Sequence, residues 1–229
     1  MWVSLCSHKH RVVLYCSVAL AGFAAFSGQP NRAQAVPLAV NSTIVSVGEP
    51  DPTGGTIKAT MTVPVTALTF HGTLTSTVIS GDPSNTLGGL TFIYQLTNDI
   101  ASPHAMERFT VNSFAGFATD ASYQTPLPLG DIAPGTVDRN LVGDVVGFSF
   151  MAPIDDTGIG HGVISPGKTS AVMVIQTDSR VFNLTFASVI DGSTGMATSF
   201  APIPEPSTLA LAGAGLVGLL LVVRRRRRC

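Results

Sequence analysis

Few residues of this chain have the types and the spacing that chemistry requires. Asp155, Asp156 and His161 lie in one glycine-rich stretch, and Asp156 opens the triplet Asp156-Thr157-Gly158. An aspartic protease uses two such triplets, whose carboxylates share a proton, and the sequence has no second one. A Ca²⁺ site needs about six to eight oxygen ligands, which two adjacent aspartates do not supply. We therefore interpret the stretch as a solvated turn.

The histidines, serines and cysteines offer no better site. His71 is predicted on an exposed strand face and His104 in a loop, without the spacing of a zinc site. Ser165 precedes a proline in a turn and lacks the Gly-x-Ser-x-Gly pattern of a hydrolase nucleophile. The cysteines lie in the terminal segments: Cys6, Cys16 and Cys229. We expect no catalytic residue, no metal and no cofactor, and hence no enzyme.

The body of the chain is acidic. Between Val36 and Ile203 there are 5 basic and 13 acidic residues, which gives a net charge of −8. A nucleic-acid-binding body would carry a basic patch, so this charge excludes such a partner. The whole chain is 45% hydrophobic and only 12% charged.

The first segment, residues 1–35, has the pattern of a secretory signal peptide. Basic residues precede an apolar run at 12–26, and a short polar region follows it. The small residues Ala33 and Ala35 fit a signal peptidase, so cleavage is predicted before Val36. The alternative is an uncleaved membrane anchor, although 15 apolar residues fall short of the roughly 20 that span a bilayer.

The last segment, residues 204–229, combines three features. Pro204-Glu205-Pro206 is predicted to be extended because its prolines oppose a helix. The apolar run at 209–223 predicts a membrane helix about 22 Å long. A cluster of arginines follows: Arg224, Arg225, Arg226, Arg227 and Arg228. By the positive-inside rule these arginines lie in the cytoplasm, which places the body outside the inner membrane.

The order of Pro204-Glu205-Pro206, apolar helix and terminal arginine cluster resembles the PEP-CTERM sorting signal. The resemblance implies that an exosortase, a transpeptidase-like membrane protease, cuts near the motif. It also implies release or re-anchoring at the cell surface, in a bacterium that makes exopolysaccharide. Cys229 departs from the family pattern. The alternative is an ordinary C-terminal anchor that is never processed.

The body, residues 36–192, alternates apolar and polar residues with a period of two, which predicts β-strands. Turn sequences rich in Gly, Pro and Asp separate them. The predicted strands are 43–47, 56–63, 68–80, 90–97, 107–118, 145–150, 170–177 and 181–190. Such strands predict an antiparallel β-sandwich, with an immunoglobulin-like Greek key as the expected form. Loops are predicted at 120–144 and 152–168, and a spacer at 193–203.

The alternation also assigns residues to the two faces of each strand. Residues expected to face the core in the strands at 56–63, 68–80 and 107–118 are Ile57, Ala59, Met61, Val63, Leu68, Phe70, Leu74, Val78, Phe109, Val111, Ala115 and Phe117. Threonines occupy most of the opposite positions in the first two of these strands.

We interpret the protein as an exported structural or adhesive component of the cell envelope or extracellular matrix. A first alternative is an exopolysaccharide-binding module, in which Tyr94 and Tyr123 would line a groove. A second alternative is a hydrolase that uses Asp156.

Overall fold

The computed structural model of the protein describes residues 35–50, 52, 54–128, 131–151 and 162–203. In these residues there are thirteen β-strands and no helix, so the predicted all-β class is confirmed. The strands are β1 (Val36–Pro37), β2 (Ser42–Val45), β3 (Gly48–Glu49), β4 (Thr56–Thr66), β5 (His71–Ser80), β6 (Leu90–Asn98), β7 (Arg108–Val111), β8 (Thr119–Gln124), β9 (Thr136–Arg139), β10 (Val146–Ser149), β11 (Met173–Thr177), β12 (Phe182–Asp191) and β13 (Ser193–Pro202).

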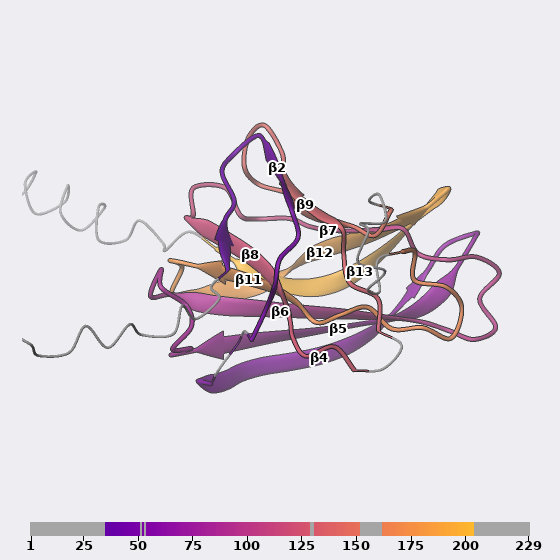
Figure 1. Cartoon of the computed structure of the whole chain (residues 1–229), viewed down its shortest axis with the longest axis horizontal. Coiled ribbons are helices and arrows are strands. Elements are labelled where there is room, and N and C mark those ends of the chain that lie inside the picture. Colours follow the sequence, from indigo (N-terminus) through magenta and orange to yellow (C-terminus); the bar gives the residue numbers. More distant parts are fainter. Residues whose placement is uncertain (1–34, 51, 53, 129–130, 152–161, 204–229) are drawn as a thin grey trace, which may run out of the picture. The chain divides into compact units, whose positions relative to one another are not determined.

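The strands form two sheets. The first has the order β1-β8-β11-β6-β5-β4, with β3 also paired to β8. The second has the order β13-β12-β7-β10-β9-β2. The strand pairs are antiparallel except that β3 runs parallel to β8. Figure 1 shows β4 and β5 low in the view and β12 and β13 above them. The predicted antiparallel arrangement is confirmed, and the immunoglobulin-like connectivity stays a prediction.

One hydrophobic core draws on the inward faces of both sheets. Leu74, Val78, Phe109 and Val111 are fully buried, as the alternation predicted. The Tyr94 ring from the first sheet packs against the Phe109 ring from the second, with centroids 5.2 Å apart. Burial of a side chain of this size is worth about 1.5–3 kcal/mol relative to leaving it in water. These contacts hold the two sheets together.

Leu68 and Ile57 were predicted to face the core, and neither does. Leu68 lies in the turn between β4 and β5, where Ala67 N–H donates to the Phe70 carbonyl, and Leu68 is 95% exposed. Ile57 is 62% exposed. The register shifts between Ile57 and Ala59, and this irregularity rotates Ile57 away from the face that Ala59 keeps.

The predicted loop at 120–144 contains two strands. β8 lies between β11 and β1, and β9 lies between β10 and β2. β8 consists mostly of small polar residues and β9 has only four residues, so neither strand shows a clear alternation of apolar and polar residues. In contrast, the strand predicted at 107–118 stops at Val111. A turn with positive φ at Ser113 and Gly116 follows it and leaves Ala115 exposed.

The predicted spacer at 193–203 is wrong, because β13 occupies it. β13 pairs with β12 from Asp191 opposite Ser193 to Phe182 opposite Pro202. Its inward residues are small, and they gave no hydrophobic signal: Gly195, Ala197, Ser199 and Ala201. A Cβ at Gly195 would lie only 3.0 Å from the Val65 side chain, so this close approach of β13 to β4 favours glycine.

Residues 1–34 and 204–229 lie outside the described residues. The signal peptide and the C-terminal membrane helix therefore stay predictions. Among the described residues, no helix has the length and apolar character needed to span a membrane.

Candidate functional site

The chain leaves the body at the end of β13. Ala201 and Pro202 are buried, and Ile203 N–H donates to the Val181 carbonyl at 3.1 Å. This hydrogen bond extends the β12–β13 pairing one residue beyond Pro202. The predicted sorting residues Pro204, Glu205 and Pro206 follow at once in the sequence. They and the arginine cluster lie outside the described residues.

Comparison of the chain with protein-family models gives a match at this point. Residues 202–228 match the model described as the PEP-CTERM protein-sorting motif. This is a PEP-CTERM domain-containing protein. The motif implies export, a membrane-anchored precursor and processing by an exosortase at the cell surface. The PEP-CTERM signal predicted from the sequence is therefore confirmed, and the match begins on the last residue of β13.

Comparison with curated proteins and with solved structures found no match. The role of the body in this PEP-CTERM protein must accordingly be argued from its own residues.

The other predicted processing site lies at the start of the body. Ala35 is buried and Val36 begins β1, where it pairs with Ala121 of β8. Cleavage before Val36 would leave β1 complete. Ala33 lies outside the described residues, and the cleavage position stays a prediction.

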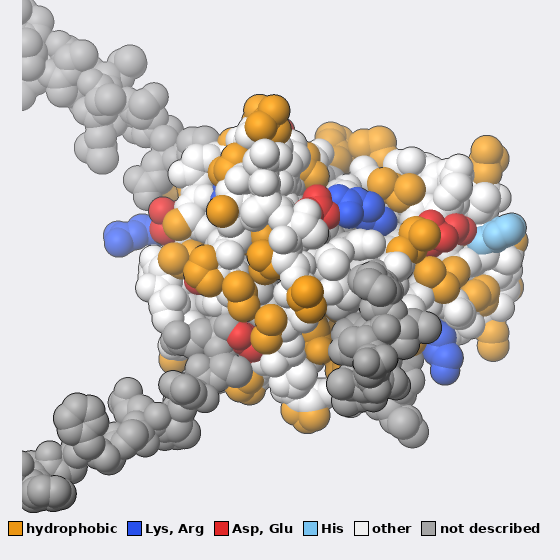
Figure 2. Space-filling view, turned by 45° about the horizontal axis from the view of Figure 1, so that its top comes forward, with side chains coloured by type: hydrophobic (Ala, Val, Ile, Leu, Met, Phe, Trp, Pro, Cys, Tyr) orange, Lys and Arg blue, Asp and Glu red, His pale blue; other side chains and the backbone are white. Residues whose placement is uncertain are grey.

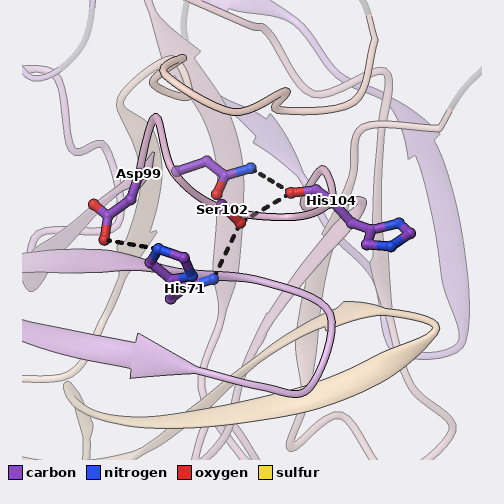
Figure 3. A network of polar contacts seen from close by, with 5 residues as sticks. His71, Asp99, Ser102 and His104 are labelled. Carbon is purple, nitrogen blue, oxygen red and sulfur yellow. Dashed lines mark hydrogen bonds and ion pairs between the residues drawn. The ribbon is translucent and has the colours of Figure 1, made fainter.

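Serine, histidine and aspartate side chains meet at one end of β5 and β6 (Figure 3). His71 begins β5, and the loop after β6 supplies Asp99, Ser102 and His104. The imidazole Nε2 of His71 lies 3.9 Å from Asp99 Oδ2, and both side chains are partly exposed. The Ser102 hydroxyl accepts the backbone N–H of His71 at 3.1 Å and donates to the His104 carbonyl at 3.1 Å.

This network does not have the geometry of a hydrolase triad. A triad serine is hydrogen-bonded to the imidazole that takes its proton. Here the partners of Ser102 are main-chain groups, and the His104 ring points away from the network (Figure 3). The buried Asn98 amide donates to the carbonyls of His104 and Ile164, which anchors the same loop. The arrangement fastens the loop after β6 to the start of β5.

Metal-ligand types do not cluster in the part of the chain that the structure describes. No group of three or more His, Cys, Asp or Glu residues there could hold an ion. Asp155, Asp156 and His161 lie outside the described residues, so their interpretation as a turn stays a prediction.

Arg139 is a buried cation that the sequence did not reveal. It lies at the end of β9, and its guanidinium donates to four carbonyls, those of Leu38, Phe114, Phe117 and Gly143. Burial lowers the pKa of Arg139, and the charge of Asp178 opposes that shift. Because the carbonyls come from three separate segments, Arg139 ties these segments together. A lone arginine in a polar stretch gives no sequence signal for such a role.

The outward side of β4 and β5 is a hydroxyl face, made of Thr60, Thr62, Thr75 and Thr77. Thr60 and Thr77 hydroxyls lie 3.2 Å apart, and Thr62 and Thr75 hydroxyls lie 2.9 Å apart. Each pair bridges the two strands directly across the ladder. The threonine alternation thus produces a regular row of cross-strand hydroxyl pairs on a solvent-facing surface.

The tyrosines do not form the groove that the glycan-binding alternative required. Tyr94 is fully buried, and its hydroxyl donates to the Phe200 carbonyl at 2.6 Å. Burial raises the pKa of Tyr94 well above its ordinary value. Tyr123 is half-buried, with its ring beside Gly48. Tyr94 is therefore a core residue and not a sugar platform.

Proposed function

We propose that this PEP-CTERM protein is an exported structural or adhesive component of the cell envelope or exopolysaccharide matrix, and that its body acts without catalysis. One observation carries the proposal: the sorting motif begins where the last strand of a packed all-β body ends. The sorting machinery thus receives a body whose final strand is already part of a sheet.

The surface chemistry of the body supports this role. Four outward residues on β4 and β5 are threonines whose hydroxyls pair across the strands, and the net charge is −8 between Val36 and Ile203. Hydroxyl groups and excess charge keep a protein soluble in a hydrated matrix. The described Ser–His–Asp network fastens a loop, which favours a non-catalytic body.

The sorting part is tested by fractionating cells with and without the matching exosortase. We expect the wild-type strain to yield a protein whose C-terminus lies near Pro204–Pro206, and the deletion strain to retain the 209–223 segment in the membrane. Mass spectrometry of the C-terminal peptide measures this difference. Equal retention in both strains would contradict processing.

Exopolysaccharide binding is the second candidate, and the hydroxyl face now favours it in place of the tyrosines. Paired hydroxyls on a flat strand surface can exchange hydrogen bonds with sugar hydroxyls. We expect the full chain to co-sediment with the purified polysaccharide, and Thr62→Val with Thr75→Val to weaken that binding. Thr110→Val, in β7 of the other sheet, is the matched control. Equal binding by both variants would exclude the hydroxyl face.

A hydrolase remains the third candidate, through Asp156. Turnover of a polysaccharide or peptide substrate that Asp156→Asn abolishes would support it, whereas turnover that survives the substitution would exclude Asp156.

A further inference from the structure

The outward side of the β12–β13 hairpin carries an apolar surface. We call it the apolar ribbon, and it consists of Phe182, Leu184, Phe186, Met196 and Phe200. Leu184, Phe186 and Met196 are 56%, 58% and 61% exposed. Phe182 and Phe200 form an edge-to-face ring pair at one end, with centroids 5.6 Å apart. Exposed apolar side chains that gather in one place commonly mark an interaction site.

The ribbon faces outward because its residues alternate with core residues. Ala187 and Val189 of β12 belong to the core, as do Ala197 and Ala201 of β13. Side chains of a strand alternate between the two faces of the sheet. The inward positions supply the core, and Phe182 and Phe200 are half-buried against it. Leu184, Phe186 and Met196 form the part of the ribbon that is mainly in water.

The ribbon is uncharged although the body is acidic. The side chains that alternate onto this face are Phe182, Leu184, Phe186, Ser188, Ile190, Thr194, Met196, Thr198, Phe200 and Pro202. None of them is ionisable, whereas the residues from Val36 to Ile203 carry a net charge of −8. Anionic lipid repels negative charge, so this uncharged face can approach a membrane at a lower electrostatic cost than an acidic face. Figure 2 shows hydrophobic side chains scattered among uncharged ones on the face in view, with charged side chains between them.

The ribbon also lies at the exit of the chain toward its membrane segment. Pro202 ends β13 opposite Phe182, and only residues 203–208 separate it from the apolar run that begins at Leu209. The seven Cα–Cα steps from Pro202 to Leu209 span at most about 25 Å even when fully extended. With the run at 209–223 in the bilayer, Pro202, which lies opposite Phe182, is therefore held within about 25 Å of the start of that run.

We propose that the apolar ribbon lies on the outer surface of the inner membrane while the protein is a membrane-anchored precursor. The proposal rests on the anchored precursor that the sorting motif implies. Phe, Leu and Met side chains enter the boundary between headgroups and acyl chains, which is how amphipathic surfaces bind membranes. The hairpin then lies along the membrane, and release by the exosortase exposes the ribbon to water.

Lipid quenching of a single tryptophan tests this contact. The full chain with Trp2→Phe is reconstituted in nanodiscs of phosphatidylethanolamine and phosphatidylglycerol, with bromine on the acyl chains near the headgroups. Phe186→Trp places the probe on the ribbon, and Thr75→Trp places it on the hydroxyl face as the matched control. We expect brominated lipid to remove most of the Phe186→Trp fluorescence and to leave the Thr75→Trp fluorescence unchanged.

A second ribbon probe, Leu184→Trp, guards against local misfolding of the first. Equal quenching at the ribbon and at Thr75→Trp, or no quenching at either ribbon position, would overturn the proposal. Ribbon fluorescence that shifts only when two chains occupy one nanodisc would assign the ribbon to a second copy and would also overturn it. Failure of the chain to enter nanodiscs would instead contradict the anchored precursor, so the two failures are distinguishable.

Discussion

The hydroxyl face and the apolar ribbon are two outer strand surfaces with opposite chemistry. On β4 and β5 four of the outward positions hold threonines that pair across the strands. On β12 and β13 the outward positions hold Leu184, Phe186 and Met196, all more than half exposed. Both surfaces cover the same core, so packing does not explain the difference. The difference instead follows the chain: the apolar surface belongs to the hairpin that leads into the sorting motif.

The largest expected effect comes from removing the side chain that joins the two sheets under these surfaces. Tyr94→Ala should destabilise the body by about 3–5 kcal/mol, because it empties a fully buried site. Tyr94→Phe keeps the ring and loses only the bond to the Phe200 carbonyl, which costs about 1 kcal/mol. Urea unfolding of the full chain, followed by circular dichroism, measures both. If the two variants were equally stable, the shared core would not hold the two surfaces in place.

The next largest effect should distinguish the buried Arg139 from the partly exposed Arg108. Arg139→Met should cost roughly 3 kcal/mol, since it leaves four carbonyls without a buried donor. Arg108→Met breaks the two-bond pairing with Asp138 on the outward side of the second sheet. That pair is partly exposed, so we expect a loss of about 1 kcal/mol or less. The same unfolding assay compares them, and a larger loss for Arg108→Met would reverse our assignment.

The stability of the body should depend on pH through Asp120 of β8, near one edge of the first sheet. Burial raises its pKa, so the folded state binds this proton more tightly than the unfolded state does. The contribution of this proton to stability is fully present below the ordinary Asp pKa of 3.8. It is lost as the pH rises through the pKa of Asp120 in the folded state. Asp120→Asn should therefore raise the melting temperature at pH 7 and give no gain in strong acid. An equal gain at both pH values would contradict this cause.

The smallest effects are expected on the two outer surfaces themselves. Thr75→Val removes one cross-strand hydroxyl bond, and such pairs are worth about 0.2–1 kcal/mol. Phe186→Thr should change stability by no more than about 0.5 kcal/mol, because the side chain is already in water. Melting curves in detergent measure both. A clearly larger loss for Phe186→Thr would mean that another part of the chain covers the ribbon.

Strands with strong alternation were predictable from the sequence, and their inward residues with them. Leu74 and Val78 are in the core because they alternate with the outward threonines of β5, although the inward residue between them is Ser76. The misses have local causes: a register shift at Ile57 and a turn at Leu68 reverse the face without changing the pattern. β13 was missed because its inward residues are small, and their fit depends on Val65 of β4 and Phe70 of the turn after β4, which are distant in the sequence.

The functional residues also fall into those that the sequence predicts and those that only the folded structure reveals. The sorting motif was predictable because its information is linear: a short motif, an apolar run and an arginine cluster. The burial of Tyr94 and the four hydrogen bonds of the Arg139 guanidinium depend on contacts between distant segments, so no local sequence pattern predicts them. The apolar ribbon was hidden for a related reason, since it needs both β13 and its pairing with β12.

The ten-residue pairing of β13 with β12 has a mechanical consequence. Force applied through the tail along the axis of β13 loads its backbone hydrogen bonds in shear, so many of them must fail together. The same force applied across the strand would open them one after another. A surface protein held by its C-terminus in flowing liquid would thus resist drag best when the hairpin points along the pull.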